Sequence, residues 1–230
     1  MSIWCWSIFP DQIVTDSATG FLFGFEFSPL IVIFGCMPHP HKHLPRLAVN
    51  YYKGRCFVFW TLCIKNRKTG WLDSLVHAHI REILLHVFHR YQIVTNVYTI
   101  MPDHMHLICE GWSSESDQLE FMSFFKRWSN FCLKDKRVEW QRQSYDHVLR
   151  EDELKKDAFL KTQQYILNNP VRKQLVEFWN EYAYSGLIIP GYPSVDKSLE
   201  LMNQLLSRAR IVYHKREKVR ETQTVRLRNW

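Results

Sequence analysis

The spacing of apolar positions along the middle of the chain predicts alternating strands and helices. Strands are indicated by runs of aromatic and β-branched residues bounded by turn residues, such as the turn at residues 66–70 and the tight connection Pro102-Asp103. Helices are indicated where apolar residues recur at helical spacing after a serine that can cap the first turn. The predicted strands are residues 56–64, 92–101, 104–110 and 137–141, and the two helices between them begin at Ser74 and Ser116.

This order of elements predicts the fold class. The order β-α-β-β-α-β is that of the split βαβ arrangement, so we expect an α+β fold with a ferredoxin-like sheet. A further helix is predicted over residues 152–169, ended by Pro170. Apolar residues recur at helical spacing over residues 198–209, which predicts a helical tail with a basic outer face.

Charge divides the chain into three parts. Residues 1–43 contain one lysine against three acidic residues, whereas residues 198–230 contain eight Lys or Arg against three Glu. We therefore expect an N-terminal extension at 1–43, a domain at 44–190 and a basic helical tail at 191–230. The extension is rich in Trp and Phe without a sustained period. Two interpretations stay open for it: sequence upstream of a natural start at Met37, or a membrane-interface anchor.

Composition narrows the class of protein. The 230 residues are 46% hydrophobic and 23% charged, which suits a globular core and excludes a disordered or fibrous chain. The net charge of +7 favours a polyanionic partner. The six cysteines lack CxxC spacing, so we expect neither a zinc ribbon nor a disulfide scaffold, and a cytoplasmic location fits best. No run of 18 apolar residues occurs, so no membrane partner is expected.

The sharpest candidate site is the segment Pro-Asp-His-Met-His-Leu-Ile at residues 102–108. Residues two apart in a strand share a face, so His104 and His106 are expected to converge while Met105 and Leu107 pack into the core. Two imidazoles placed in this way can hold one divalent metal ion and leave positions open for a phosphate. Taken alone, this spacing is more typical of an exposed sheet face with two ordinary histidines.

The second candidate is the segment Gln-Tyr-Ile-Leu-Asn-Asn-Pro-Val-Arg at residues 164–172. On a helix, Tyr165 and Asn169 are four apart and share a face. A tyrosine hydroxyl is a poor nucleophile at its ordinary pKa near 10 and needs a metal or a base to assist it. An amide oxygen from Asn169 could complete the ligands of such a metal. Taken alone, the segment is more typical of a surface tyrosine beside a helix terminus.

Together the two segments resemble the single-tyrosine HUH endonucleases, in which a His-hydrophobic-His strand precedes a tyrosine helix. The neighbouring residues resemble one group of these, the REP-associated tyrosine transposases, in order over about residues 44–190. The resemblance implies transposition or recombination chemistry: cleavage of single-stranded DNA near hairpins through a 5′-phosphotyrosine. The matching segments are Leu44-Pro-Arg-Leu47, Met101–Ile108, Trp140-Gln141, Tyr145-Asp-His-Val-Leu-Arg150 and Tyr165–Arg172.

Site roles follow from this resemblance. Tyr165 matches the nucleophile, and His104, His106 and Asn169 match the ligands of a Mg²⁺ or Mn²⁺ ion. The implied partner is hairpin-bearing single-stranded DNA, bound by a monomer or homodimer that associates with the nucleoid when DNA-bound. Residues 172–175, Arg-Lys-Gln-Leu, depart from the family, which usually has a small residue and Gly there. The candidate DNA-binding residues are Lys126, Arg127, His147, Arg150 and Arg172, with further basic positions at 134–137 and 208–228.

Three other interpretations use the same residues. Residues 53–60, Lys-Gly-Arg-Cys-Phe-Val-Phe-Trp, partly match the RNP1 pattern, which would indicate a non-catalytic nucleic-acid-binding module on the same fold. They fall on the first predicted strand, however, rather than the third. A degenerate transposase that binds hairpins without cutting is a milder form of this alternative. A structural zinc protein would need cysteines placed to join His104 and His106, and none is so placed.

Overall fold

The structure, a computed structural model, describes residues 46–189 and 198–228, with side chains described as far as residue 221. These residues belong to one compact unit, Pro38–Trp230. The expected N-terminal extension at 1–43 lies outside the described residues, as does the start of the expected tail at 191–197. In the part of the chain that is described, no helix is both long and apolar enough to span a membrane.

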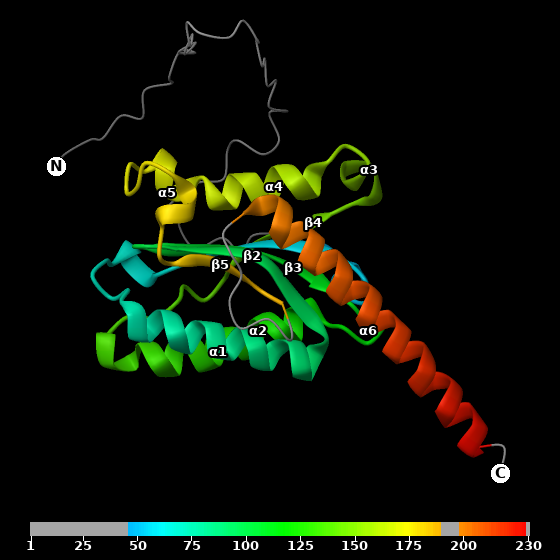
Figure 1. The fold of residues 1–230 in the computed structure, drawn as a ribbon. Coiled ribbons are helices and arrows are strands. Elements are labelled where there is room, and N and C mark those ends of the chain that lie inside the picture. The colour runs from blue at the N-terminus through cyan, green and yellow to red at the C-terminus, as the bar shows by residue number, and fades with distance from the viewer. Residues whose placement is uncertain (1–45, 190–197, 229–230) are drawn as a thin grey trace, which may run out of the picture. The chain divides into compact units, whose positions relative to one another are not determined.

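Five antiparallel strands form a single sheet in the order β4-β1-β3-β2-β5. The order of the first four is that of a ferredoxin-like sheet, and β5 is added at the edge beside β2 (Figure 1). The predicted fold class is therefore confirmed. The strands are β1 Phe57–Cys63, β2 Ile93–Met101, β3 His104–Gly111, β4 Tyr145–Leu149 and β5 Ser185–Ile188.

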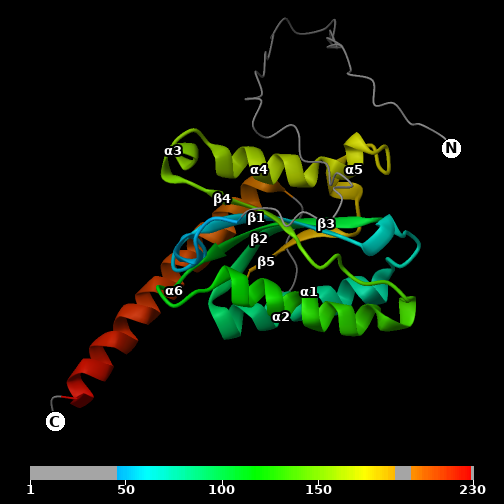
Figure 2. The ribbon, with the colours of Figure 1, turned by 180° about the vertical axis from the view of Figure 1, so that it is seen from behind.

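Helices cover both faces of this sheet (Figures 1 and 2). On one face, α1 (Ser74–Tyr91) and α2 (Gln118–Leu133) bury their apolar sides against Trp60, Leu62 and Leu107. On the other face, α4 (Ala158–Leu167) and the first turns of α6 pack on a second cluster. The remaining helices are α3 Glu151–Leu154, α5 Asn169–Arg172, α6 Leu199–Arg228, and the 3-10 turns η1 Val49–Tyr52, η2 Lys65–Arg67, η3 Lys134–Lys136 and η4 Trp179–Glu181.

Aspartates cap both helices in place of the predicted serines. The cap of α1 lies one residue before Ser74, and the cap of α2 lies one residue after Ser116. Asp73 caps α1, its carboxylate accepting from the Val76 N–H at 2.8 Å. Asp117 caps α2 by accepting from two backbone N–H groups of the first turn. A carboxylate also offsets the positive end of the helix dipole, which a serine does not. The hydroxyl of Ser116 instead donates to the carbonyl oxygen of Gln92 at 3.0 Å.

The predicted fourth strand at residues 137–141 is wrong, because β4 lies further on, at Tyr145–Leu149. Residues 137–141 contribute only an isolated bridge between Ile64 and Trp140. Trp140 is buried because its ring packs edge-on against Trp71, and its indole N–H donates to Ser129 at 2.8 Å. Packing beneath α2 therefore accounts for the apolar pattern that suggested a strand.

The predicted helix at 152–169 is broken into α3, α4 and α5. The break lies at Asp157, whose φ of 59° is left-handed and cannot continue a right-handed helix. Pro170 does not end the helix but occupies the first turn of α5, where a missing N–H costs nothing. Residues 172–175, which differ from the family pattern, still form a turn. Gln174 adopts a φ of 55° there, a conformation that glycine takes most easily.

Candidate active site and nucleic-acid interface

Strand β3 places both predicted metal ligands on the face covered by α4. His106 is paired in register with Thr61 of β1, and His104 with Cys63. Met105 and Leu107 between and after them are fully buried in the core beneath α1 and α2. The alternation expected from a strand period of two is therefore present.

The two imidazoles face each other through the same ring nitrogen. The distance between their Nε2 atoms is 3.1 Å. The Nδ1 atom of His104 lies 2.6 Å from an oxygen of Asp103, to which it donates, and the Nδ1 atom of His106 lies 2.9 Å from the Thr61 hydroxyl. Partners on Nδ1 fix the ring orientation and leave Nε2 as the atom for binding, the arrangement that outer partners give to metal-bound histidines.

Burial also sets the protonation state of His106. Its side chain is 3% exposed, and this burial lowers its pKa well below the usual 6.5, with His104, Arg172 and Arg67 adding in the same direction. His106 is therefore neutral at neutral pH, the form in which imidazole binds a metal. Because a hydroxyl both donates and accepts, Thr61 can hold either tautomer of this ring.

Helix α4 brings Tyr165 to the histidines. Its ring centroid lies 5.6 Å from that of His106 and 6.0 Å from that of Phe59, which itself stacks on His106. The guanidinium of Arg172, in α5, lies 5.3 Å from the centre of the Tyr165 ring. Two segments some sixty positions apart in sequence thus meet at one place.

Asn169 follows Tyr165 by one helical turn and is buried. Its amide nitrogen donates to the backbone carbonyl of Tyr165 at 2.7 Å, which leaves the amide oxygen as the acceptor for a metal. Among the described residues, no group of three or more His, Cys, Asp or Glu could hold a metal ion. His104 and His106 offer imidazole nitrogens and Asn169 an amide oxygen, which are donor types that divalent cations such as Mn²⁺ accept.

The predicted DNA-binding residues do not gather in one place. Arg172 is at the site, and His147 is in register with Phe59 on the same face, where it bonds Glu153 at 2.9 Å. Arg150 is exposed at the start of α3. The other two candidates lie on α2, on the opposite face of the sheet. Lys126 donates to the carbonyls of Gln141 and Arg142, and burial lowers the pKa of this lysine to about 8. Arg127 lies on the same helix.

Sequence reasoning missed the links around His104. Asp103 accepts from His104 with one oxygen and from Arg67 of η2 with the other, at 2.7 Å. These three residues join the histidine pair to the loop after β1. The Pro-Asp-His segment signalled Asp103 only as a turn residue, and nothing in the sequence pattern indicated Arg67.

A basic surface continues from that loop. It is a hollow of about 610 Å³ whose cations come from η2, the end of α2 and η3. Its exposed aromatic ring is Phe131, 71% exposed. Of its five cations only Lys65 has an acidic partner among the described residues, Glu139 at 2.7 Å. We name this the η2–η3 basic surface: Lys65, Lys68, Arg127, Lys134, Arg137 and Phe131.

Replacing Asp103 by alanine should weaken Mn²⁺ binding about 10-fold or more, because the His104 ring would lose the partner that orients it. The measurement is isothermal titration of Mn²⁺ into the protein. Asp146→Ala is a suitable control, since this carboxylate lies on β4 and bonds Arg46 and Tyr52 instead of a histidine. Equal Mn²⁺ affinity in the two variants would contradict a positioning role for Asp103.

The sheet order and the helices on its two faces define an α+β fold of the ferredoxin-like type. Among solved structures, the chain is similar to that of a REP-associated tyrosine transposase bound to a REP hairpin. The match has a TM-score of 0.53 at 20% sequence identity and covers 63% of this chain and 81% of that chain. At this identity the likeness shows the fold. No protein-family model matches the chain, and no curated protein does.

Proposed function

We propose that the chain is a transposase-like endonuclease and strand transferase that acts on single-stranded DNA at hairpins through a 5′-phosphotyrosine. The observation that carries this proposal is the contact between the Tyr165 ring and the His104–His106 pair, made by residues from separate elements. The shared fold with a hairpin-bound tyrosine transposase supports it.

The chemistry assigned to Tyr165 is an in-line displacement. Its hydroxyl oxygen forms a bond to the scissile phosphorus, the bond from phosphorus to the 3′ oxygen breaks, and the phenol proton passes through solvent to the departing 3′ oxygen. The diester bond is conserved in the phosphotyrosine, so a second 3′-hydroxyl can reverse the step and join strands. Arg172 lies beside the Tyr165 ring, where its charge can hold the phosphate.

We further propose Mg²⁺ or Mn²⁺ as the cofactor, held by His104, His106 and Asn169. When bound, such an ion neutralises and orients the phosphate. His106 contributes because its burial keeps it neutral, and His104 because Asp103 fixes its ring. Manganese suits imidazole ligands better than magnesium does.

The η2–η3 basic surface is assigned to the DNA backbone. It begins at Lys65, directly after the strand that pairs with His104, and Arg67 in the same turn bonds Asp103. The turn η2 therefore links the histidine site to this surface, whose other side chains come largely from α2 and η3. Such a combination of cations and an exposed ring supplies grip without base specificity.

One observation disfavours the non-catalytic alternative. A base-stacking sheet needs exposed rings, but Phe57 packs against Phe159 of α4 at 5.0 Å and Phe59 against Tyr165. The strand that resembles the RNP1 pattern is therefore beneath a helix.

The test is formation of a covalent adduct. The full chain is incubated with labelled hairpin-bearing single-stranded DNA and Mn²⁺ or Mg²⁺, and the products are separated in SDS. We expect an SDS-resistant protein–DNA band that disappears with EDTA and is absent with fully duplex DNA. Absence of any adduct, with hairpin binding intact, would favour the binding module instead.

Removing two cations from the η2–η3 basic surface should weaken hairpin binding. We expect Arg127→Ala with Lys134→Ala to lower affinity about 10-fold at low salt and to reduce the slope of log affinity against log salt by about 2. The control is Lys155→Ala with Lys156→Ala, which removes the same charge from the exposed turn between α3 and α4, outside the helix that carries Tyr165. Fluorescence anisotropy at several salt concentrations measures both variants, and identical slopes would exclude this surface.

A further inference from the structure

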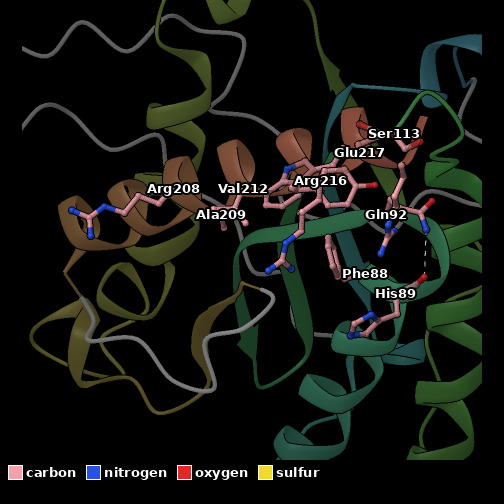
Figure 3. A pocket seen from close by; sticks show the side chains of 12 residues that line it. Phe88, His89, Gln92, Ser113, Arg208, Ala209, Val212, Arg216 and Glu217 are labelled. Carbon is pink, nitrogen blue, oxygen red and sulfur yellow. Dashed lines mark hydrogen bonds between the residues drawn. The ribbon is translucent and has the colours of Figure 1, made fainter. Parts of the chain in front are cut away.

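A second cavity lies at the far end of β3 from the histidines. It has a volume of about 740 Å³ and lies between the end of α1, the residues after β3 and the middle of α6 (Figure 3). Trp112, in its lining, is eight residues beyond His104, so about 26 Å of extended strand separates it from the candidate active site. Figure 3 shows Phe88 and His89 from α1 on one side and Val212 and Arg216 from α6 on the other.

The inner wall of this cavity is aromatic. Phe88, Trp112 and Tyr213 pack on one another with ring centroids 5.3 to 5.9 Å apart. Phe88 and Tyr213 are only partly buried, so their rings are available to a flat ligand. Trp112 is 1% exposed, and its buried indole N–H has no hydrogen-bond partner among the described residues. Trp112 therefore lies behind Phe88 and Tyr213, and these two rings are the ones that a ligand can touch.

The outer wall is cationic. Arg208 and Arg216 of α6 line the cavity and have no acidic partner among the described residues. The one carboxylate in the lining, Glu217, is bonded by Arg55 and His214, each at 3.3 Å. The unpaired charge facing a ligand is therefore positive.

Helix α6 is held in place on this side. Arg210 bonds Glu110 of β3 at 2.6 Å, and Asn96 of β2 donates to the same carboxylate oxygen at 3.0 Å. Met202 and Leu206 are buried against the sheet a turn or two earlier. The Glu110 carboxylate is buried, so losing its bond to Arg210 would leave a buried charge without an ion-pair partner, and this bond holds that part of α6 against β3.

We propose that this cavity binds one nucleotide unit, with an aromatic base against Phe88 and Tyr213 and its phosphate on Arg216. Aromatic rings beside arginines are the combination that binds unpaired nucleotides. The source is either a free nucleotide or an unpaired segment of the bound DNA. Binding of an unpaired DNA segment rests on the proposed function. It would give the protein a second binding site for the same DNA strand, distant from Tyr165.

The experiment uses the full-length Tyr165→Phe protein, so that DNA is not consumed. The first probe is a hairpin with a single-stranded tail, compared with the same hairpin without the tail by fluorescence anisotropy. The second probe is thymidine monophosphate, followed by quenching of tryptophan emission. The test variant is Arg216→Ala, and the control is Lys215→Ala, its exposed neighbour on α6, which does not line the cavity.

We expect Arg216→Ala to weaken binding of the tailed hairpin about 10-fold and Lys215→Ala to change it less than about 2-fold, while the tail-less hairpin is affected equally by both. Binding of thymidine monophosphate that Arg216→Ala weakens would assign the cavity to a free nucleotide. Equal effects of the two variants on every probe would overturn the proposal. Thermal melts of both variants check that each one folds.

Failure here is distinguishable from failure of the proposed function. The Arg216→Ala change in the protein that retains Tyr165 leaves the adduct assay as an independent readout. An adduct without any difference between Arg216→Ala and Lys215→Ala rejects the cavity alone. A difference in binding without any adduct rejects the nuclease alone.

Discussion

Replacing Tyr165 by phenylalanine should abolish the covalent protein–DNA adduct and leave hairpin binding within about 2-fold of the parent. Removal of the hydroxyl deletes the proposed nucleophile. The ring stays, so its edge contacts with His106 and Phe59 and the stacked guanidinium of Arg172 are retained. The measurements are the SDS-resistant band and the anisotropy of a labelled hairpin.

Tyr145 provides the matched control. It lies on β4 in register with Thr61, and its phenol is close enough to Tyr165 to be influenced by it. Burial, with the nearby Asp146, raises the pKa of Tyr145, which lowers the fraction of its phenol that is ionised and able to attack. Tyr145→Phe should therefore keep the adduct. An adduct that survives Tyr165→Phe but is lost in Tyr145→Phe would transfer the proposed role to β4.

The parts of the fold that the sequence predicted depend on periodicity. Strand β3 alternates buried Met105 and Leu107 with His104 and His106 because a buried face imposes a period of two. The spacing of four positions from Tyr165 to Asn169 likewise places both on one side of a helix turn. The same local patterns also predicted where the first three strands lie along the chain.

The parts that were missed depend on contacts between distant segments. The Arg67–Asp103–His104 chain links two loops, and no local pattern marks it. The break at Asp157 arises from one left-handed residue in a sequence of good helix formers. Strand β4 is a short edge strand, so its pattern was weaker than that of the Trp140 segment packed under α2.

One expectation about the metal site changes with the structure. Two histidines on an exposed strand face would cost little stability when replaced, but His106 is 3% exposed and bonded to Thr61. His106→Ala would therefore leave a cavity and an unpaired hydroxyl as well as removing a ligand. His106→Gln fills more of the space and can still bond Thr61, so it is the better variant for testing metal binding.

His104→Ala and His106→Gln should each lower the metal-dependent cleavage rate at least about 100-fold at limiting Mn²⁺, because each removes one of two imidazole ligands. Met105→Ala should keep the Mn²⁺ dependence and instead lose about 2–5 kcal/mol of stability, since its side chain is fully buried on the opposite face. Asn169→Ala should give a milder loss of rate, because water can replace an amide oxygen.

The experiment compares neighbouring residues of β3 that are expected to differ in effect. The histidine variants should lose metal-dependent cleavage, whereas Met105→Ala should lose stability. Cleavage rates are measured across a Mn²⁺ titration, with thermal melts of the same variants. High Mn²⁺ should partly rescue Asn169→Ala but not the histidine variants. Because Met105 lies between the two histidines, a general disturbance of β3 would lower the rate in Met105→Ala as well. An unchanged Mn²⁺ dependence in Met105→Ala would exclude that cause. Histidine variants that cleave at the parental rate throughout the titration would remove the metal site from the proposal and leave a nucleic-acid-binding module on this fold.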